Sequence, residues 1–481
     1  MMLALACAIG WVAQCAQAQT AAGESIVLNP HSPAYGHPYR HGVVPSREAH
    51  QDMQLWRALN ASASTVGTQT LSYGGGLNGA GVTSGTPRVY LVVYGNQWGT
   101  AGTDANGNMT LSRDAVGAVP YLQRLFQGLG TAGELWSGTM TQYCDGAGVS
   151  AGATMCPSTS PKVGYPNGTT LAGIWYDNSV ASPDQATAAQ LAQEAANAAA
   201  HFGNTGVGSN RYAQYVILSP SGAHPDGFNT SGGNFCAWHS YTTASSGNVA
   251  YTNMPYVSDM GASCGANFVN AGSAGSLDGF SIVEGHEYAE TVTDQFPSTG
   301  WINHTGSSYN GEEDGDECAW LGSGQGAAAD VSMGTGSFAM QSTWSNDTNR
   351  CDISHPVVVV QTGVGTLSAS PSSVSMSASG GAVAMRTVTI TNSGPGTLSA
   401  IGADLTLISG GGVSEMGIGS DACTGATLSP GGACTIKLVF SSGCLPNSSD
   451  FSRWNLAVNG TVATSVLNVS VTGTTTKGLC R

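Results

Sequence analysis

Residues 279–294 contain the side chains whose types and spacing best suit chemistry. The stretch reads Gly-Phe-Ser-Ile-Val-Glu-Gly-His-Glu-Tyr-Ala-Glu-Thr-Val-Thr-Asp and predicts a helix. His286 and Glu290 are four residues apart, so both project from one face of that helix, where they can chelate one metal ion. Glu287 is rotated from His286 by about 100° and can hold a water beside the metal as a general base. The pattern H-E-x-x-E therefore predicts a zinc site in which a carboxylate replaces the second imidazole of H-E-x-x-H.

A second acidic stretch follows at residues 312–317, where five carboxylates occupy six positions. Like charges this close repel one another unless they are solvated or bound to a cation. Three interpretations stay open. The stretch is a solvated loop, it supplies the third zinc ligand from Glu313 or Asp316, or it forms a calcium loop from the oxygens of Glu312, Asp314 and Asp316.

His239 is a further candidate, in the stretch Phe-Cys-Ala-Trp-His-Ser-Tyr at residues 235–241. It is either a ligand or a catalytic group that polarises a substrate carbonyl, with Cys236 fixing its position, and the alternative is a structural histidine. Four further histidines are scattered singly among Pro and Tyr, and we expect them to be solvent-exposed rather than to bind metal: His31, His37, His41 and His50.

Composition narrows the classes of function. Only 9% of the 481 residues are charged, and 29 acidic against 14 basic residues give a net charge of −15. So few cations cannot neutralise a nucleic-acid backbone or form a basic patch for an anionic membrane. An apolar run at residues 3–12 precedes Ala16-Gln17-Ala18, which predicts a signal peptide over residues 1–18. No later segment has 18 consecutive apolar residues, so we expect a secreted, extracellular protein without a membrane span.

Cysteine usage agrees with export. Ten of the twelve cysteines follow the predicted signal peptide, an even number as a disulfide framework requires. None forms a C-x-x-C pair, which argues against a cysteine zinc site. Proximity in the sequence suggests the pairs Cys144–Cys156, Cys236–Cys264, Cys318–Cys351, Cys423–Cys434 and Cys444–Cys480.

Two regions of different character position these residues. Apolar strands predicted at 88–94, 172–176 and 215–219 alternate with helices at about 114–129 and 184–202, which indicates an α/β domain with a mostly parallel sheet. From residue 356 onward, short strands separated by Gly, Ser and Pro turns predict an all-β immunoglobulin-like sandwich. The expected organisation is an N-terminal arm or propeptide at 19–70, with a short helix near 51–58, an α/β metallopeptidase domain at 71–355 and the sandwich at 356–481.

Six short motifs, in order along residues 70–320, resemble the Exordium/phosphate-induced secreted family of plants and its bacterial relatives: Leu71–Gly76, Val89–Gly95, Gln142–Cys144, His286–Asp294, Gly300–Trp301 and Glu313–Cys318. That family has a His-Glu-x-x-Glu helix followed by a Glu-x-x-Asp-x-Cys segment. The resemblance implies a secreted protein with a zincin-like site, and by position it points to His286, Glu287, Glu290, Glu313, Asp316 and Cys318. Asp314 stands where the family usually has an apolar residue.

The C-terminal region has its own resemblance. Residues 387–394 and 428–436 are similar to immunoglobulin-like domains of the abnormal-spindle/hydin type. The resemblance implies a binding or spacer module, for a surface or matrix, rather than chemistry.

The sequence thus predicts a secreted zinc-dependent endopeptidase that hydrolyses extracellular proteins or peptides with metal-activated water. The alternative is a non-catalytic, Exordium-like cell-wall or matrix protein stabilised by Ca²⁺. A third interpretation, a carbohydrate-directed protein, requires exposed tryptophans at Trp98, Trp136 and Trp301.

Overall fold

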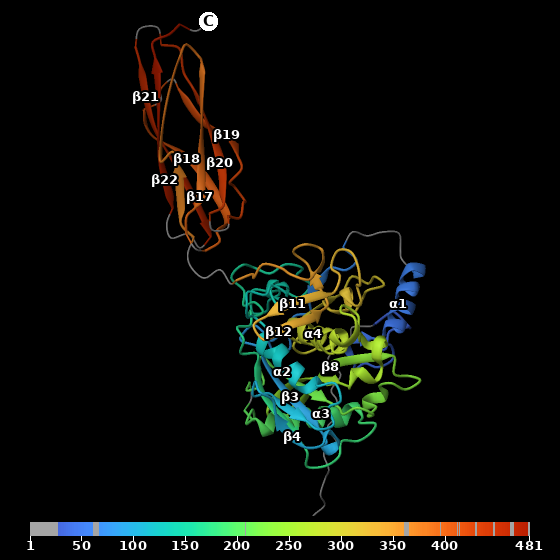
Figure 1. The fold of residues 1–481 in the computed structure, drawn as a ribbon. Coiled ribbons are helices and arrows are strands. Elements are labelled where there is room, and N and C mark those ends of the chain that lie inside the picture. The colour runs from blue at the N-terminus through green and yellow to red at the C-terminus, as the bar shows by residue number, and fades with distance from the viewer. Residues whose placement is uncertain are drawn as a thin grey trace, which may run out of the picture. The chain divides into compact units, whose positions relative to one another are not determined.

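A computed structural model describes residues 27–479, with gaps at 61–66, 207, 360–364, 395, 411, 413, 429–430, 446–447 and 462–465. The predicted signal peptide and Cys480 lie outside the described residues. The chain divides into two compact units, residues 1–359 and 360–481 (Figure 1). No helix in the described part of the chain is long and apolar enough to cross a membrane.

A six-stranded mixed sheet is the centre of the first unit. Its order is β1-β8-β9-β7-β3-β6. The strands are β1 (His41–Pro45), β3 (Arg88–Tyr94), β6 (Leu171–Asp177), β7 (Ala213–Leu218), β8 (Phe235–Ala244) and β9 (Gly247–Met254). β3 pairs in parallel with β6 and β7, and β7 with β9, whereas β8 pairs antiparallel with β9 and β1. The expectation of a mostly parallel sheet therefore holds only in part, because residues 235–254 form a hairpin that the strand–helix alternation does not reveal.

Four α-helices accompany this sheet: α1 (Arg47–Asn60), α2 (Ala118–Gly128), α3 (Ala188–His201) and α4 (Asp278–Thr293). α2 begins four residues after the predicted start, because Asp114 stays outside the helix and its carboxylate accepts the N–H groups of Ala118 and Val119 at 2.9 and 2.8 Å. α3 begins with a capping box between Thr187 and Gln190.

Short elements complete the first unit. Two-stranded sheets pair β2 (Leu71–Tyr73) with β10 (Trp301–Asn303), β4 (Ala101–Thr103) with β5 (Met109–Leu111), β11 (Ala329–Met333) with β12 (Gly336–Met340), and β13 (Thr343–Ser345) with β14 (Arg350–Asp352). Seven 3₁₀ turns are described: η1 (Asn96–Trp98), η2 (Thr139–Gln142), η3 (Pro225–Gly227), η4 (Val257–Asp259), η5 (Gly261–Cys264), η6 (Gly272–Gly275) and η7 (Asp316–Cys318).

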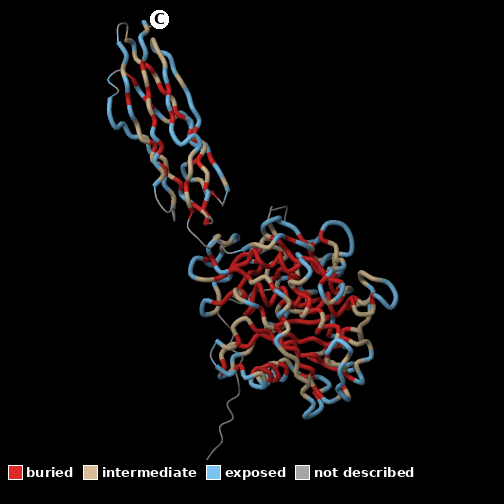
Figure 2. The backbone as a smooth tube through the Cα atoms, turned by 60° about the vertical axis from the view of Figure 1, so that its left-hand side comes forward, coloured by how far each residue is buried: buried red, intermediate tan, exposed pale blue. Residues whose placement is uncertain are grey.

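The interior of the first unit is rich in aromatic side chains, and Figure 2 shows how much of its backbone is buried. Trp98, Trp136 and Trp301 are exposed by only 2, 1 and 1%. The indole N–H groups of Trp136 and Trp301 donate to the carbonyl oxygens of Gln341 and Cys144. The third interpretation, which requires these tryptophans to be exposed for sugar stacking, is therefore wrong, since they pack against other aromatic side chains in the interior.

Four predicted disulfides are present among the described residues: Cys144–Cys156, Cys236–Cys264, Cys318–Cys351 and Cys423–Cys434. Disulfides of this kind form and persist in oxidising compartments. The fifth predicted pair involves Cys480, which the structure does not describe.

The second unit contains two four-stranded sheets, of order β15-β17-β20-β19 and β16-β22-β21-β18. The strands are β15 (Leu367–Ser370), β16 (Ser373–Ser379), β17 (Val383–Asn392), β18 (Ser399–Gly410), β19 (Glu415–Asp421), β20 (Ala433–Ser441), β21 (Asp450–Thr461) and β22 (Leu467–Thr476). Residues 357–359, at the start of the predicted sandwich, are irregular. Both sheets contribute to one apolar core, as a sandwich requires.

Candidate metal centre

Helix α4 carries the predicted H-E-x-x-E motif through the interior of the first unit. All sixteen of its residues are buried, and it packs on β8, β12 and β1. The Asp278 carboxylate anchors its start by accepting the N–H groups of Val269 and Asn270. The Asp294 carboxylate shapes the turn after it by accepting the N–H groups of residues 298–300. A fully buried helix is an unusual place for three ionisable groups, so their contacts are informative.

The four-residue spacing brings His286 and Glu290 together as predicted from helical geometry. His286 Nε2 lies 2.9 Å from Glu290 Oε1. The Asp316 side chain, from η7, completes this group: Asp316 Oδ1 lies 3.6 Å from His286 Nε2, and the Asp316 N–H donates to Glu290 Oε1 at 2.9 Å. Asp316 thus meets both residues, whereas Glu313 points to a different partner.

His239, on β8, forms a second group with α4. Its Nδ1 lies 3.1 Å from Glu287 Oε2 and 3.5 Å from Glu290 Oε2. Its Nε2 lies 3.5 Å from Glu313 Oε1. Three carboxylates therefore surround His239, which favours its interpretation as a ligand or catalytic group over that of a structural histidine.

The structure brings all six predicted site residues into one place, which we call the acid–imidazole cluster: His239, His286, Glu287, Glu290, Glu313 and Asp316. Two sets within it each offer three ligand atoms within 4.8 Å of one another, His286–Glu290–Asp316 and His239–Glu287–Glu290. Glu290 belongs to both sets, with one carboxylate oxygen turned to each. Either set can hold a metal ion.

Several buried atoms of the cluster make no contact with hydrogen-bond geometry, although His286 Nε2 and Glu290 Oε1 lie close together. They are His239 Nε2, both ring nitrogens of His286, Glu287 Oε1, Glu290 Oε2 and Glu313 Oε2. A buried polar atom without a partner is unfavourable by about 1–3 kcal/mol, and more when it is charged. Unpartnered lone pairs that converge on one place fit a cation better than they fit a purely structural network.

The pKa values of the cluster residues are shifted because many acids are buried in one place. Burial raises the pKa of Glu287 and of Glu313 well above the ordinary range, and it raises the pKa of Glu290 to about 8. Burial also lowers the pKa of His239 well below its ordinary value. For His286 burial alone would lower the pKa, but the Glu290 and Asp316 carboxylates outweigh it and leave the pKa well above its ordinary value. Without a cation, these acids therefore hold protons that a bound metal would displace.

The remaining acids of residues 312–317 do not form a solvated loop. Glu312 pairs with Arg57 of α1, and Glu317 accepts from the Asn303 amide at 2.7 Å. Asp314 is fully buried, with Thr293 donating to it at 3.1 Å. The calcium interpretation that combined Glu312, Asp314 and Asp316 is not favoured by this geometry, since Glu312 and Asp314 each face a different protein partner.

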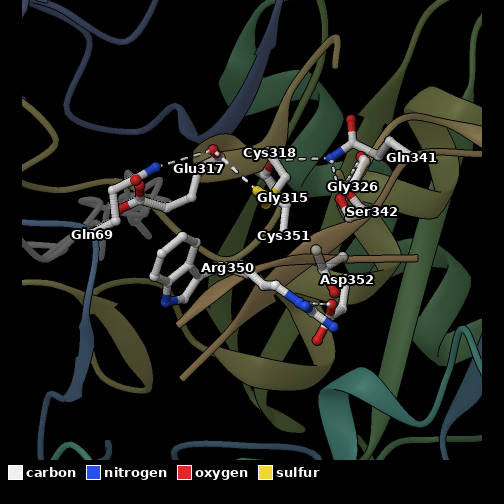
Figure 3. The surroundings of a disulfide bond; sticks show 12 residues. Gln69, Gly315, Glu317, Cys318, Gly326, Gln341, Ser342, Arg350, Cys351 and Asp352 are labelled. Atoms are coloured by element: carbon white, nitrogen blue, oxygen red, sulfur yellow. Dashed lines mark hydrogen bonds and ion pairs between the residues drawn. A yellow bond between two sulfur atoms is a disulfide. The ribbon is translucent and has the colours of Figure 1, made fainter. Parts of the chain in front are cut away.

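The Cys318–Cys351 disulfide fixes the turn that carries Asp316. Figure 3 shows it with Glu317 and Gln69 on one side and Gln341 on the other; the Gln341 amide donates to the Gly315 carbonyl at 2.9 Å. Beside this turn lies a cavity of about 1100 Å³, lined by Glu317, Trp320, Cys351 and residues of α1. None of the six cluster residues lines it.

Sequence reasoning missed the contribution of β1 to the site. β1 pairs antiparallel with β8 and sets His41 opposite His239. His41 is half-buried, and its desolvation lowers its pKa to about 4. His50 in α1 is only 8% exposed. The expectation that these two histidines are solvent-exposed is therefore wrong. A pairing across about 200 positions leaves no local signal in the sequence.

Two glycines also approach the cluster closely. A side-chain carbon on Gly42 would overlap the Glu290 carboxylate and the His239 ring, and one on Gly315 would crowd Glu290 and His286. Glu290 is thus enclosed by backbone on both sides. Sequence reasoning assigned neither glycine a role, because close backbone approach depends on the fold.

No protein-family model matches the chain, and no curated protein matches it. Solved structures give partial likenesses. The secreted serine protease VesC from Vibrio cholerae is 14% identical over 21% of this chain and 21% of its own, with a TM-score of 0.17. The VesB protease of the same organism is 14% identical over 36 and 52%, with a TM-score of 0.14. The PapD-like domain 7 of human CEP192 is 12% identical over 27 and 99%, with a TM-score of 0.17. Likenesses this slight indicate neither a shared fold nor a shared activity.

Proposed function

We propose that the chain is a secreted zinc-dependent endopeptidase acting on extracellular proteins, with the acid–imidazole cluster as its active site. One observation carries the proposal: two imidazoles and four carboxylates converge in the interior with ligand atoms that have no hydrogen-bond partner. The resemblance of the H-E-x-x-E helix and the 313–318 segment to the Exordium/phosphate-induced family supports the same proposal. The second unit would serve as an immunoglobulin-like spacer or surface-binding module.

The donor set favours zinc over calcium. Zinc accepts imidazole nitrogen and carboxylate oxygen, whereas calcium takes six to eight oxygen ligands. His286, Glu290 and Asp316 would hold the ion. Bound there, zinc would lower the pKa of a water and polarise a substrate carbonyl.

Glu287 and His239 would then handle the proton. The Glu287 carboxylate is one helix position from His286, outside the first ligand set, and is a suitable base for the attacking water. His239 Nδ1, 3.1 Å from Glu287 Oε2, orients that carboxylate. After attack, Glu287 would pass the proton to the leaving amine, so that the base of one step is the acid of the next.

The burial of the cluster favours a second candidate function. The side chains of His239, His286, Glu287 and Glu290 are at most 1% exposed, and Asp316 is 14% exposed. A cation enclosed this completely would also suit a non-catalytic extracellular protein that uses the ion to stabilise its fold.

Glu287→Gln distinguishes the two candidates. Glu284→Gln is the matched control, because Glu284 is equally buried, lies one turn earlier on α4 and belongs to neither ligand set. Under the peptidase proposal both variants retain stoichiometric zinc by elemental analysis, and casein hydrolysis falls about 10²–10⁴-fold only in Glu287→Gln. Wild-type protein without a transition metal after dialysis would contradict the proposal, and zinc without hydrolysis in any variant would favour the structural role.

A further inference from the structure

The acid–imidazole cluster is buried, and part of its cover is the chain's own N-terminal segment, which we define as residues 27–60. Within that segment β1 lies directly against the cluster, with His41 paired to His239, Val44 to Ala237 and Pro45 to Phe235. The pairing is irregular between His41 and Val44, and Gly42 in this bulge has a φ of +48°. Because any side chain at this position would overlap Glu290 and His239, only a glycine allows the strand to lie there.

β1 is an edge strand of the six-stranded sheet. It occupies one end of the sheet and is bonded to β8 alone. Extended peptides bind proteins in this way: main-chain hydrogen bonds to a sheet edge give affinity, and the side chains at the closest approach give selectivity. The edge of β8 carries His239, so a peptide bound to it would pass over the cluster as β1 does.

The N-terminal segment is attached to the rest of the unit differently from β8 and the turn that carries Asp316. β8 is held by the Cys236–Cys264 disulfide and the turn carrying Asp316 by Cys318–Cys351. The sequence has no cysteine between positions 15 and 144, so the N-terminal segment has no disulfide of its own. Its noncovalent anchors are the side chains of Val43 and Val44 in the apolar core and three polar contacts. Arg40 pairs with Asp226 at 2.7 Å, Arg57 pairs with Glu312, and the Trp320 indole donates to the Pro45 carbonyl at 2.8 Å.

One face of α1 borders an open pocket. Five residues of α1 line this pocket of about 1100 Å³, together with residues of η7 and β14: Arg47, His50, Gln51, Gln54 and Leu55. A helix with one face on an open pocket loses less packing when it leaves than one packed on all sides.

We propose that the edge of β8 that β1 covers is the binding site for an extended peptide with glycine at the point nearest Glu290, and that residues 41–45 occupy this site as an internal competitor. This inference rests on the proposed function, because it names the substrate class and the regulation of the same site. Displacement of β1 opens the cluster, while the Cys236–Cys264 and Cys318–Cys351 disulfides keep β8 and the turn carrying Asp316 in place.

Gly42→Val in the full chain tests the inference, with Gly36→Val as the matched control. Both glycines have positive φ, at +48° and +76°, so both substitutions introduce backbone strain, but nothing lies within 4 Å of a side-chain carbon at Gly36. We expect Gly42→Val to retain zinc and to hydrolyse casein about tenfold faster than wild type. An increase of this size follows if about one tenth of the wild-type molecules have an open cluster and nearly all of the variant molecules do. Gly36→Val should match wild type.

A binding measurement separates this inference from the proposed function. A fluorescent peptide with the sequence of residues 38–48 should bind Gly42→Val protein, and the same peptide with valine at the glycine position should not. If neither peptide binds, or if both bind equally, the inference is wrong whatever the hydrolysis assay shows. Zinc loss in Gly42→Val would also overturn it, because β1 would then be part of the metal site. If the glycine peptide binds but neither wild type nor any variant holds zinc or hydrolyses casein, the proposed function alone is contradicted.

Arg40→Gln provides a second route to the open state if Gly42→Val does not fold. It removes the Arg40–Asp226 ion pair at the start of β1 without touching the cluster. Faster amide hydrogen exchange over residues 41–45, together with binding of the glycine peptide, is the expected result. Faster exchange without peptide binding would contradict the inference.

Discussion

The two units of this chain bury different kinds of side chain. The core of the second unit is apolar, and its buried polar residues, among those described, are neutral: Asn392, Ser414, Ser442, Ser452 and Thr475. The first unit buries many carboxylates, four of them on α4 alone. In the second unit, the described buried residues are apolar or neutral, as strand periodicity specifies. The first unit departs from this pattern at the acid–imidazole cluster, where function is expected.

The departure has an energetic consequence. Buried carboxylates without a countercharge are strongly unfavourable, and proteins retain them when protons, partner charges or metals compensate. The acid–imidazole cluster contains more acids than its two histidines can pair. The first unit should therefore respond to metal and pH, and the second should not.

The largest expected effect is on metal binding. Glu290→Gln should lower zinc affinity about a hundredfold or more, since even second-layer partners of metal ligands are worth 10–100-fold, and Glu290 serves both ligand sets. Glu284→Gln on the same helix should leave the affinity unchanged. Competition with a fluorescent chelator measures both. Stoichiometric zinc in Glu290→Gln at wild-type affinity would contradict the assignment.

Metal removal comes next. A site bound at about 1000 times its Kd contributes about 4 kcal/mol to stability, so chelation should lower the Tm of the first unit by several degrees. The transition of the second unit should not move. Scanning calorimetry with EDTA, followed by addition of zinc, checks both. Equal shifts of the Tm in the two units would show that metal removal does not distinguish the first unit from the second.

A core truncation tests the second unit in the opposite way. Leu438 on β20 is fully buried, so Leu438→Ala should lower the free energy of unfolding by about 2–5 kcal/mol. Lys437→Ala, at the neighbouring exposed position, should change it by about 0.5 kcal/mol or less. Denaturant titration gives both values, and zinc content should stay constant. A change in zinc content would show that the two units are coupled.

The smallest expected effect is a pH dependence within the first unit, away from the cluster. Burial raises the pKa of Glu194 on α3 to about 7 from an ordinary 4.5. The folded state then holds this proton more tightly than the unfolded state, so stability falls as the pH rises from about 4.5 to 7. Glu194→Gln should remove that loss and raise the Tm by a few degrees at pH 8 but not at pH 4.

Glu415→Gln on the exposed surface of β19 is the control for this prediction. It should leave the Tm unchanged at both pH values. A Glu194→Gln effect of the same size at pH 4 and pH 8 would show that packing, rather than titration, is responsible.

Local chemistry was predictable where it depends on short spacing. The i, i+4 geometry of His286 and Glu290 follows from the helical repeat, and four disulfides join cysteines that are neighbours in the sequence. The strands β3 and β7 follow from continuous apolar runs, because a strand buried on both faces needs them. The run at 172–176 also predicted β6, which is half-buried at the end of the sheet. The hairpin of β8 and β9 was not predicted, since its sequence mixes polar and aromatic residues.

The helical repeat was enough to predict that acids and a histidine meet on one face of α4, because the backbone alone sets that distance. The choice between Glu313 and Asp316 as the neighbour of His286 was not predictable, since it depends on how the turn at residues 312–317 folds. The place of His239 in the cluster and the approach of Gly42 to it come from the tertiary fold. Those contacts depend on pairing β1 with β8, and the loop closure that brings such distant strands together is stabilised by the whole core rather than by any local signal.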